Sequence, residues 1–284
     1  MPNSLLNDTN LASVSAFLHS SDAVISISDA QKIYFLNEAI TAPAGIRILV
    51  GLTNAVIPNS IYNISSTNNS IVISGQTYTI EAGNYSAKDL ATTLSFAITA
   101  VGSVTFNDQN NVFLFNFTTA QTIDSTTMER QLGLKNQLPT ASATVYKCEG
   151  SCDLGGTTNI YFRLSNLTLN NLDSRGKSTN IIANIVNQSN YGDFIFYTPP
   201  ENNYYLVNET NISHLDIELT DQDGTLLDLN GCDYNITLTF HFVKERESLV
   251  KASLLKQIQM AYDVKKKDRD DEKNKTTENK NVDK

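Results

Sequence analysis

The chain has 284 residues, of which 40% are hydrophobic, and a formal net charge of −9 at pH 7. This length and composition allow one large all-β domain or two smaller ones, each with a packed core. Residues 1–243 hold 9 basic and 21 acidic groups, because 12 of the 21 basic and 9 of the 30 acidic residues lie further along the chain. We do not expect so acidic a body to bind nucleic acid. The sequence has no apolar run of 18 residues that would predict membrane insertion.

The N-terminal part of the chain changes from a polar segment to a series of predicted strands. Residues 1–21 are polar with scattered apolar side chains, and we expect an N-terminal arm that is extended or weakly helical. Alternating apolar positions then predict strands at Ala23–Ser28, Lys32–Leu36, Gly45–Leu52 and Ile61–Ile64. The 32 asparagines, with many Thr and Ser, also favour strands and turns over long helices.

Residues 66–120 carry a different pattern, which predicts a small ββαββ subdomain inserted into the all-β domain. The predicted elements are a hairpin of strands 70–74 and 76–80 around Gly75, a helix Ala87–Ala100 capped by Ser86, and strands 103–107 and 112–117. A further short helix at Ser125–Leu132 is expected to begin at Ser125 and to end at Gly133.

Strands resume after the insertion and finish with the clearest signal of the chain, Ile212–Val243. The intermediate strands are predicted at Thr144–Cys148, Ile160–Leu164, Ile181–Val186, Phe194–Tyr197 and Tyr204–Val207. Within the final stretch, apolar and polar residues alternate on both sides of a turn at Asp221–Gly224, which is typical of a half-buried antiparallel pair. Leu226 and Phe240 are expected to face the core, and His241 the opposite face.

These segments predict a mainly β fold with one β-sandwich made of residues 22–65 and 121–243. The sandwich is interrupted by the inserted subdomain. Residues 244–264 predict a helix by their apolar spacing, and residues 265–284 form a charged segment with too few aliphatic side chains for a core, which predicts a disordered tail.

Histidines and cysteines offer no pattern for catalysis or metal binding. His214 and His241 lie far apart on predicted strands, and the pair Cys148 and Cys152 has no second Cys or His pair at zinc-finger spacing. The third cysteine, Cys232, makes an odd number, which with no signal peptide argues against a secreted disulfide framework. Whether the first two form a disulfide stays open. We assign no catalytic, cofactor-binding or metal-binding residue, and we expect no enzyme.

Acidic residues of the final stretch have structural interpretations. Asp221–Asp228 contains part of a calcium-loop pattern, but neither flanking helices nor a closing Glu are present, so a tight β-turn is the better interpretation. Asp216 and Glu218 alternate onto the outer face of a predicted strand, where they are expected to aid solubility and to protect a sheet edge.

The order of seven segments resembles the minor capsid (penton) proteins of virophages, Polinton-like viruses and related viruses whose major capsid proteins are double jelly rolls. The segments are Val56–Ile64, Gly83–Leu90, Val112–Phe117, Gln131–Leu134, Asn159–Leu167, Ile181–Val186 and Leu215–Phe240. The similarity covers about residues 20–243. The chain departs from the family at Pro58-Asn59 and in the length of its segment after Val243.

The resemblance implies a single jelly-roll β-sandwich whose strands stand roughly upright at a capsid vertex. Five copies would form a homopentamer that closes the fivefold axis, surrounded by major capsid proteins of the double-jelly-roll type. The family has no catalytic residues to transfer. The implied location is the virion, after synthesis in the host cell and without secretion.

Two other functions are compatible with a β-sandwich of this composition. One is a receptor- or carbohydrate-binding protein, lectin-like or a fibre head, for which Tyr191, Tyr204 and Tyr205 are the candidate exposed aromatic residues. The other is a jelly-roll enzyme of the cupin type, which would need a clustered set of His and Glu ligands rather than three scattered histidines.

Overall fold

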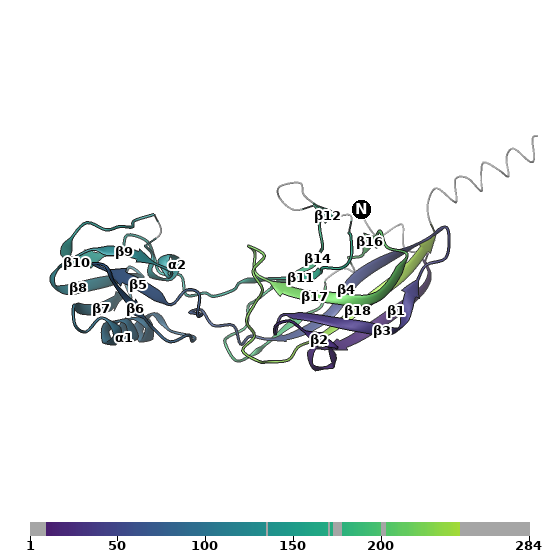
Figure 1. Ribbon diagram of the computed structural model, residues 1–284, viewed down its shortest axis with the longest axis horizontal. Coiled ribbons are helices and arrows are strands. Elements are labelled where there is room, and N and C mark those ends of the chain that lie inside the picture. Colours follow the sequence, from purple (N-terminus) through teal and green to yellow (C-terminus); the bar gives the residue numbers. More distant parts are fainter. Residues whose placement is uncertain (1–9, 135, 170, 173–177, 200–202, 245–284) are drawn as a thin grey trace, which may run out of the picture.

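The structure is a computed structural model that describes residues 10–134, 136–169, 171–172, 178–199 and 203–244 (Figure 1). It contains two hydrophobic cores. The larger core belongs to a β-sandwich, and the smaller one to residues 64–154, which we call the small unit. Two chain segments join the small unit to one end of the sandwich (Figure 1). Apart from Lys244, the predicted C-terminal helix and charged tail lie outside the described residues.

One layer of the sandwich, sheet A, is antiparallel and has five strands. They are β1 (Asn10–His19), β18 (Asn235–Lys244), β4 (Ile46–Pro58), β15 (Phe194–Tyr197) and β16 (Tyr205–Val207). The order is β1-β18-β4-β15, and β16 pairs with β4 beside β15. β4 pairs with β15 through residues 55–58 and with β16 through residues 48–50, so the two short strands together follow one side of β4.

The other layer, sheet B, is also antiparallel. Its strands, in spatial order, are β14 (Ile181–Val186), β11 (Asn159–Leu164), β17 (Asn211–Thr220), β3 (Gln31–Thr41) and β2 (Ile25–Ser26). A short 3-10 turn, Ser20–Asp22, leads from β1 to β2, and a small hairpin pairs β12 (Asn171–Leu172) with β13 (Ser178–Thr179).

The connectivity of the sandwich is that of a jelly roll, as the resemblance to the penton family implied. The eight main strands in chain order are β1, β3, β4, β11, β14, β15, β17 and β18, and they fall into the orders β1-β18-β4-β15 and β14-β11-β17-β3. The chain therefore passes repeatedly between the two sheets, which is the double Greek key of a jelly roll.

Alternating side chains fill the space between the sheets. Phe240 from β18 and Phe162 from β11 are both 0% exposed, and Tyr234 is equally buried at the start of the last strand. The Tyr34 hydroxyl donates to the His19 carbonyl oxygen at 3.1 Å, and burial raises the pKa of Tyr34 to about 12. The predicted half-buried strand around Phe240 is confirmed.

The sequence prediction was wrong at three places in the sandwich. Residues 61–64, expected to form a strand, are irregular apart from an isolated bridge between Ile64 and Gly83. Residues 10–19, expected to be part of an arm, form strand β1 and pair with β18 along its length. The alternation of apolar and polar residues is obscured in this strand, because the large apolar Phe17 points outward and is 81% exposed, while the small Ala16 beside it points inward. Leu226 is 37% exposed rather than buried, and its neighbour Leu227 fills the core instead.

Two three-stranded sheets and two helices make up the small unit. One sheet is ordered β6 (Gln76–Thr79), β5 (Ser70–Ile73), β9 (Ile123–Thr126), and the other β10 (Ala143–Lys147), β8 (Val112–Gln121), β7 (Gly102–Asn107). The helices are α1 (Ala87–Ala97) and α2 (Glu129–Leu132). Of the helices that the structure describes, neither has the length and apolar character to cross a membrane.

Local sequence signals explain several of these elements. The Ser86 side chain accepts a hydrogen bond from the Asp89 N–H and so caps α1, as predicted. Ser74 and Gly75 both have positive φ, at 45° and 81°, which closes the β5–β6 hairpin with the turn that matches strand twist. Gly133 ends α2 with φ of 70°.

The second core extends beyond the predicted boundary of 66–120. Strand β9 pairs with β5, and β10 pairs with β8, so both complete sheets of the small unit rather than of the jelly roll. Leu132 and Cys148, which follow β9 and β10, are 0% exposed in the second core. The proposed cap Ser125 lies within β9, and α2 begins at Glu129. Pairing between strands that lie far apart in the sequence leaves no local signal in it.

Candidate functional site: a groove between the units and a carboxylate-free sheet

A polar groove lies where the two linking segments leave the sandwich. Its volume is about 450 Å³, and its walls include Tyr62 and Asn63 from one linker, Thr157 from the other, and Asp228 from the sandwich. Arg130 of α2 borders the groove from the small unit. The groove is thus built by both units and by the segments between them.

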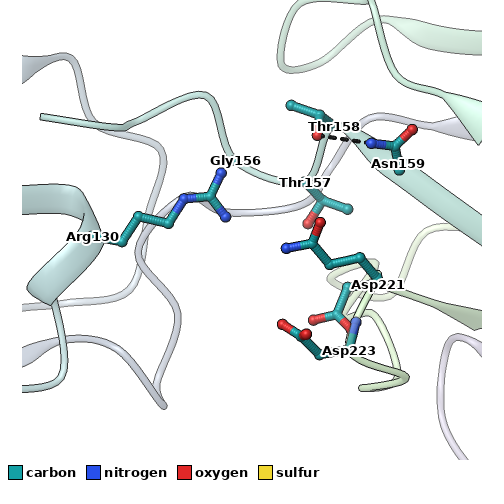
Figure 2. Close-up of a pocket in the computed structure, with 8 residues that line it drawn as sticks. Arg130, Gly156, Thr157, Thr158, Asn159, Asp221 and Asp223 are labelled. Atoms are coloured by element: carbon teal, nitrogen blue, oxygen red, sulfur yellow. Dashed lines mark hydrogen bonds between the residues drawn. The ribbon is translucent and has the colours of Figure 1, made fainter. Parts of the chain in front are cut away.

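Charges of opposite sign face each other across this region. Arg130 reaches from α2 toward the sandwich, where Asp221 and Asp223 stand on the loop that follows β17 (Figure 2). The Arg130 Nε donates to the Asp153 Oδ2 at 2.6 Å, which holds the start of the guanidinium within the small unit. This ion pair is more than a third exposed on both sides, so it contributes little to stability.

The conformation of the acidic loop is fixed by hydrogen bonds between its backbone N–H groups and the Asp221 side chain. The Asp221 Oδ1 accepts hydrogen bonds from the N–H groups of Asp223 and Thr225, both at 2.9 Å. Gly224 has φ of 86°, which L-residues with a side chain rarely adopt. The turn predicted at residues 221–224 is confirmed. Within the described ranges, no three His, Cys, Asp or Glu side chains lie close enough together to hold a metal ion.

Asn63 ties the linkers together at the base of the small unit. Its Nδ2 donates to the carbonyl oxygens of Tyr85 and Leu154, at 2.9 and 3.2 Å. Its Oδ1 accepts from the Tyr85 N–H at 2.9 Å. Because the side chain is only 6% exposed, these bonds satisfy a buried amide and position the two linkers side by side.

The histidines lie on different strands and cannot converge on one metal. His241 of β18 meets Tyr204 edge-to-face at 4.3 Å between ring centroids, and partial burial lowers the pKa of its imidazole. His214 of β17 stacks on Phe35 of β3 at 5.9 Å, on the other sheet. The third, His19, accepts from the Ser21 N–H at the end of β1.

The three cysteines differ in burial and are all free thiols. Cys148 lies in the second core, where burial raises its pKa to about 12. Cys152 is partly buried, and its thiol donates to the Asn111 Oδ1 at 3.1 Å. Cys232 is exposed on the sandwich. The possible disulfide between the first two is therefore absent in this structure.

The candidate aromatic residues of a lectin-like site are dispersed. Tyr191 is 45% exposed and lies against Tyr62, with 5.8 Å between ring centroids. Tyr204 instead packs on His241. Tyr205 is half-buried in β16, opposite Val50. They do not form one exposed platform.

Sheet B carries charge on its outer face. The Gln31 Nε2 donates to the Glu218 Oε1 at 3.1 Å and to the Asp216 Oδ1 at 3.4 Å. Partial burial raises the pKa of Asp216, and the nearby Glu218 adds to the effect. These carboxylates were predicted to protect a sheet edge, but β17 lies between β11 and β3 in the interior of the sheet.

Sheet A is chemically different, because none of its five strands contains an Asp or Glu. Hydroxyl groups meet on its outer face: the Thr239 Oγ1 lies 3.2 Å from the Ser15 Oγ and 3.4 Å from the Thr53 Oγ1. Exposed aromatic side chains stand at both edges, Phe17 on β1 and Phe194 and Phe196 on β15. Sequence reasoning missed this surface, since it requires the strand order.

No protein-family model and no curated protein matches this sequence. A comparison of structures finds similarity to the crystal structure of the selenomethionine-labelled mavirus penton protein. The two share 12% sequence identity with a TM-score of 0.45, over 81% of this chain and 99% of the other.

Proposed function

We propose that this chain is a structural capsid protein whose homopentamers close the fivefold vertices of an icosahedral capsid. The observation that carries the proposal is the architecture: a complete jelly roll with a second, separately cored unit at one end (Figure 1). Jelly rolls recur in viral capsid proteins. The order of segments that resembles the penton family supports the fivefold assembly and a double-jelly-roll major capsid protein as the partner.

The two ends of the roll differ, which suggests an orientation at the vertex. The strands run roughly along the long axis of the molecule, and the small unit continues from one end (Figure 1). β18 ends at the opposite end, because Lys244 pairs with Ile46 while Asn235 pairs with Val56 near the linker. With the roll upright, the small unit would project outward and residues 245–284 would start from the interior side.

The positions of the histidines favour this structural role over a cupin-type enzyme. Cupin metal sites need ligands that converge, whereas His214 and His241 belong to different sheets and His19 lies at a strand end. The dispersed tyrosines likewise give less support to a lectin-like site than to a capsid protein.

The test is assembly with the cognate major capsid protein. We expect the purified chain, alone or with that partner, to form a closed ring with the mass of five chains, measured by native mass spectrometry. Electron microscopy of co-expressed particles should show fivefold density at the vertices that is absent when this chain is left out. A stable monomer that never enters particles would contradict the proposal.

A further inference from the structure

Neither edge strand of sheet A carries charge or proline that would hinder pairing with another chain, although β15 is short, with four residues. β1 has ten residues, none of them Lys, Pro, Asp or Glu, and its only irregularity is a register shift between Asn10 and Ala12. β15 also contains none of these residues. Within the described residues, no strand pairs with the outer side of either one. Natural edge strands are usually blunted by charge, proline or a bulge unless something covers them.

The same two edges present the two most exposed aromatic side chains of the sandwich, Phe17 and Phe196, together with Phe194, which is as exposed as Phe35 on sheet B. Phe17 is 81% exposed, Phe196 is 77% exposed and Phe194 is 55% exposed. Phe17 lies opposite Thr237, and Phe196 opposite Val56, both on the outer face of sheet A. Because β18 and β4 separate the two strands, each molecule carries an aromatic group at each side of one sheet.

Charge favours a contact at sheet A between two copies of this chain. Each copy carries a net charge of −9, so most of its surfaces would repel a second copy. The strands of sheet A contain no carboxylate, whereas β3 and β17 of sheet B hold Glu38, Asp216 and Glu218. Depletion of charge with enrichment of aromatic residues is typical of the centre of a protein interface.

The available area is close to what a specific contact needs. A ten-residue antiparallel strand such as β1 is about 34 Å long. A strip of that length and about 20 Å wide, the depth of two stacked sheets with their side chains, covers on the order of 700 Å² and includes the adjoining edge of sheet B as well as that of sheet A. A standard interface buries about 800 Å² per partner. On the opposite edge, Val207 of β16 is bridged to Leu169 on the side away from β4, so the open part of this edge is β15, which pairs with residues 55–58 of β4.

We propose that the β1 edge of one copy packs against the β15 edge of the next copy, with Phe17 against Phe194 and Phe196. The inference rests on the proposed function and deepens it by assigning the surface through which copies meet. Two different edges on opposite sides of one sheet make a heterologous contact, so every copy keeps one free edge until a ring closes. A partner of another kind would need only one of the two edges.

The experiment uses the full chain with Phe17→Ser or Phe196→Ser, measured by native mass spectrometry and sedimentation over a range of concentrations. Each substitution should weaken ring formation at least tenfold, because buried aromatic side chains dominate interface energies. Phe96→Ser is the matched control, since Phe96 is also 77% exposed but lies on α1 of the small unit. Circular dichroism checks that all three variants remain folded.

Mixing the two edge variants gives a sharper result. The Phe17→Ser chain keeps an intact β15 edge and the Phe196→Ser chain an intact β1 edge, so the mixture should form a dimer of one chain of each that grows no further. If both variants form rings as well as the wild-type protein does, the edge contact is wrong, but the proposed vertex function is not affected. Wild-type protein that forms rings but never enters particles would instead contradict the vertex function alone.

Discussion

Phe240 and His241 are adjacent in β18 and point to opposite faces of sheet A. Phe240 is fully buried between the sheets, while His241 lies against Tyr204 on the outer face. The alternation of apolar and polar residues in this strand was sufficient to predict both orientations. Leu226 shows the limit of that reasoning, because it lies in a turn region where side chains do not follow the period of a strand, and the neighbouring Leu227 is buried in its place.

Substitution of Asp at each of the two positions should show which face of the strand is buried and which is exposed. Phe240→Asp puts an unpaired charge in the core and should cost about 5 kcal/mol or more, comparable to the whole stability of a small domain, so we expect insoluble protein. His241→Asp should remain soluble, with a modest fall in the urea midpoint. Equal losses of soluble protein from both substitutions would show that the strand is buried on both sides.

At the scale of elements, the sequence predicted the positions of strands and of the first helix better than it predicted which strands pair. Ser86 and Gly75 carry local signals, a helix cap and a hairpin turn, and both were located correctly. β1 was missed because the outward Phe17 is larger than the inward Ala16 beside it. β9 was not predicted as a strand, and β10 was assigned to the wrong core, because their partners are distant in sequence. The groove between the units and the carboxylate-free sheet depend on such distant pairings and could not be predicted.

Excision of the small unit tests the separation of the two cores. Replacing residues 65–153 by a short Gly-Ser link should leave a folded sandwich, because Asn63 and Leu154 already lie within hydrogen-bond distance. Deleting only residues 66–120 should instead give aggregated protein, since β9 and β10 would lose β5 and β8. Far-UV circular dichroism and the cooperativity of thermal unfolding measure the outcome. Loss of the sandwich in the first deletion would show that the two cores fold as one.

At the scale of the whole molecule, charge and assembly oppose each other. Every chain carries a net charge of −9, and a ring brings several such chains together. If the contact surfaces are the uncharged edges of sheet A, no ion pairs between copies compensate for this repulsion. The free energy of assembly then contains an unfavourable electrostatic contribution that dissolved salt can screen.

Raising the salt concentration should therefore strengthen the ring. Between about 0.02 M and about 0.5 M NaCl, where the screening length falls from roughly 20 Å to a few ångströms, the dissociation constant should decrease. Sedimentation equilibrium at each concentration measures it, and sodium sulfate at matched ionic strength separates screening from effects on apolar burial. Weaker assembly in high salt would indicate that ion pairs, rather than neutral edges, hold the copies together.

The double attachment of the small unit has a mechanical consequence. A unit joined by a single chain segment can rotate freely about that segment. A unit joined by two parallel segments can rotate only if the two segments wind around each other. The amide of Asn63, bonded to Leu154 of the other linker, keeps the two segments together where such a twist would begin. Bending about the line through both linkers requires no such winding. On a fivefold ring, each small unit would bend about its linkers toward or away from the axis but would not rotate about its own long axis. It would therefore keep the same face turned to its neighbours.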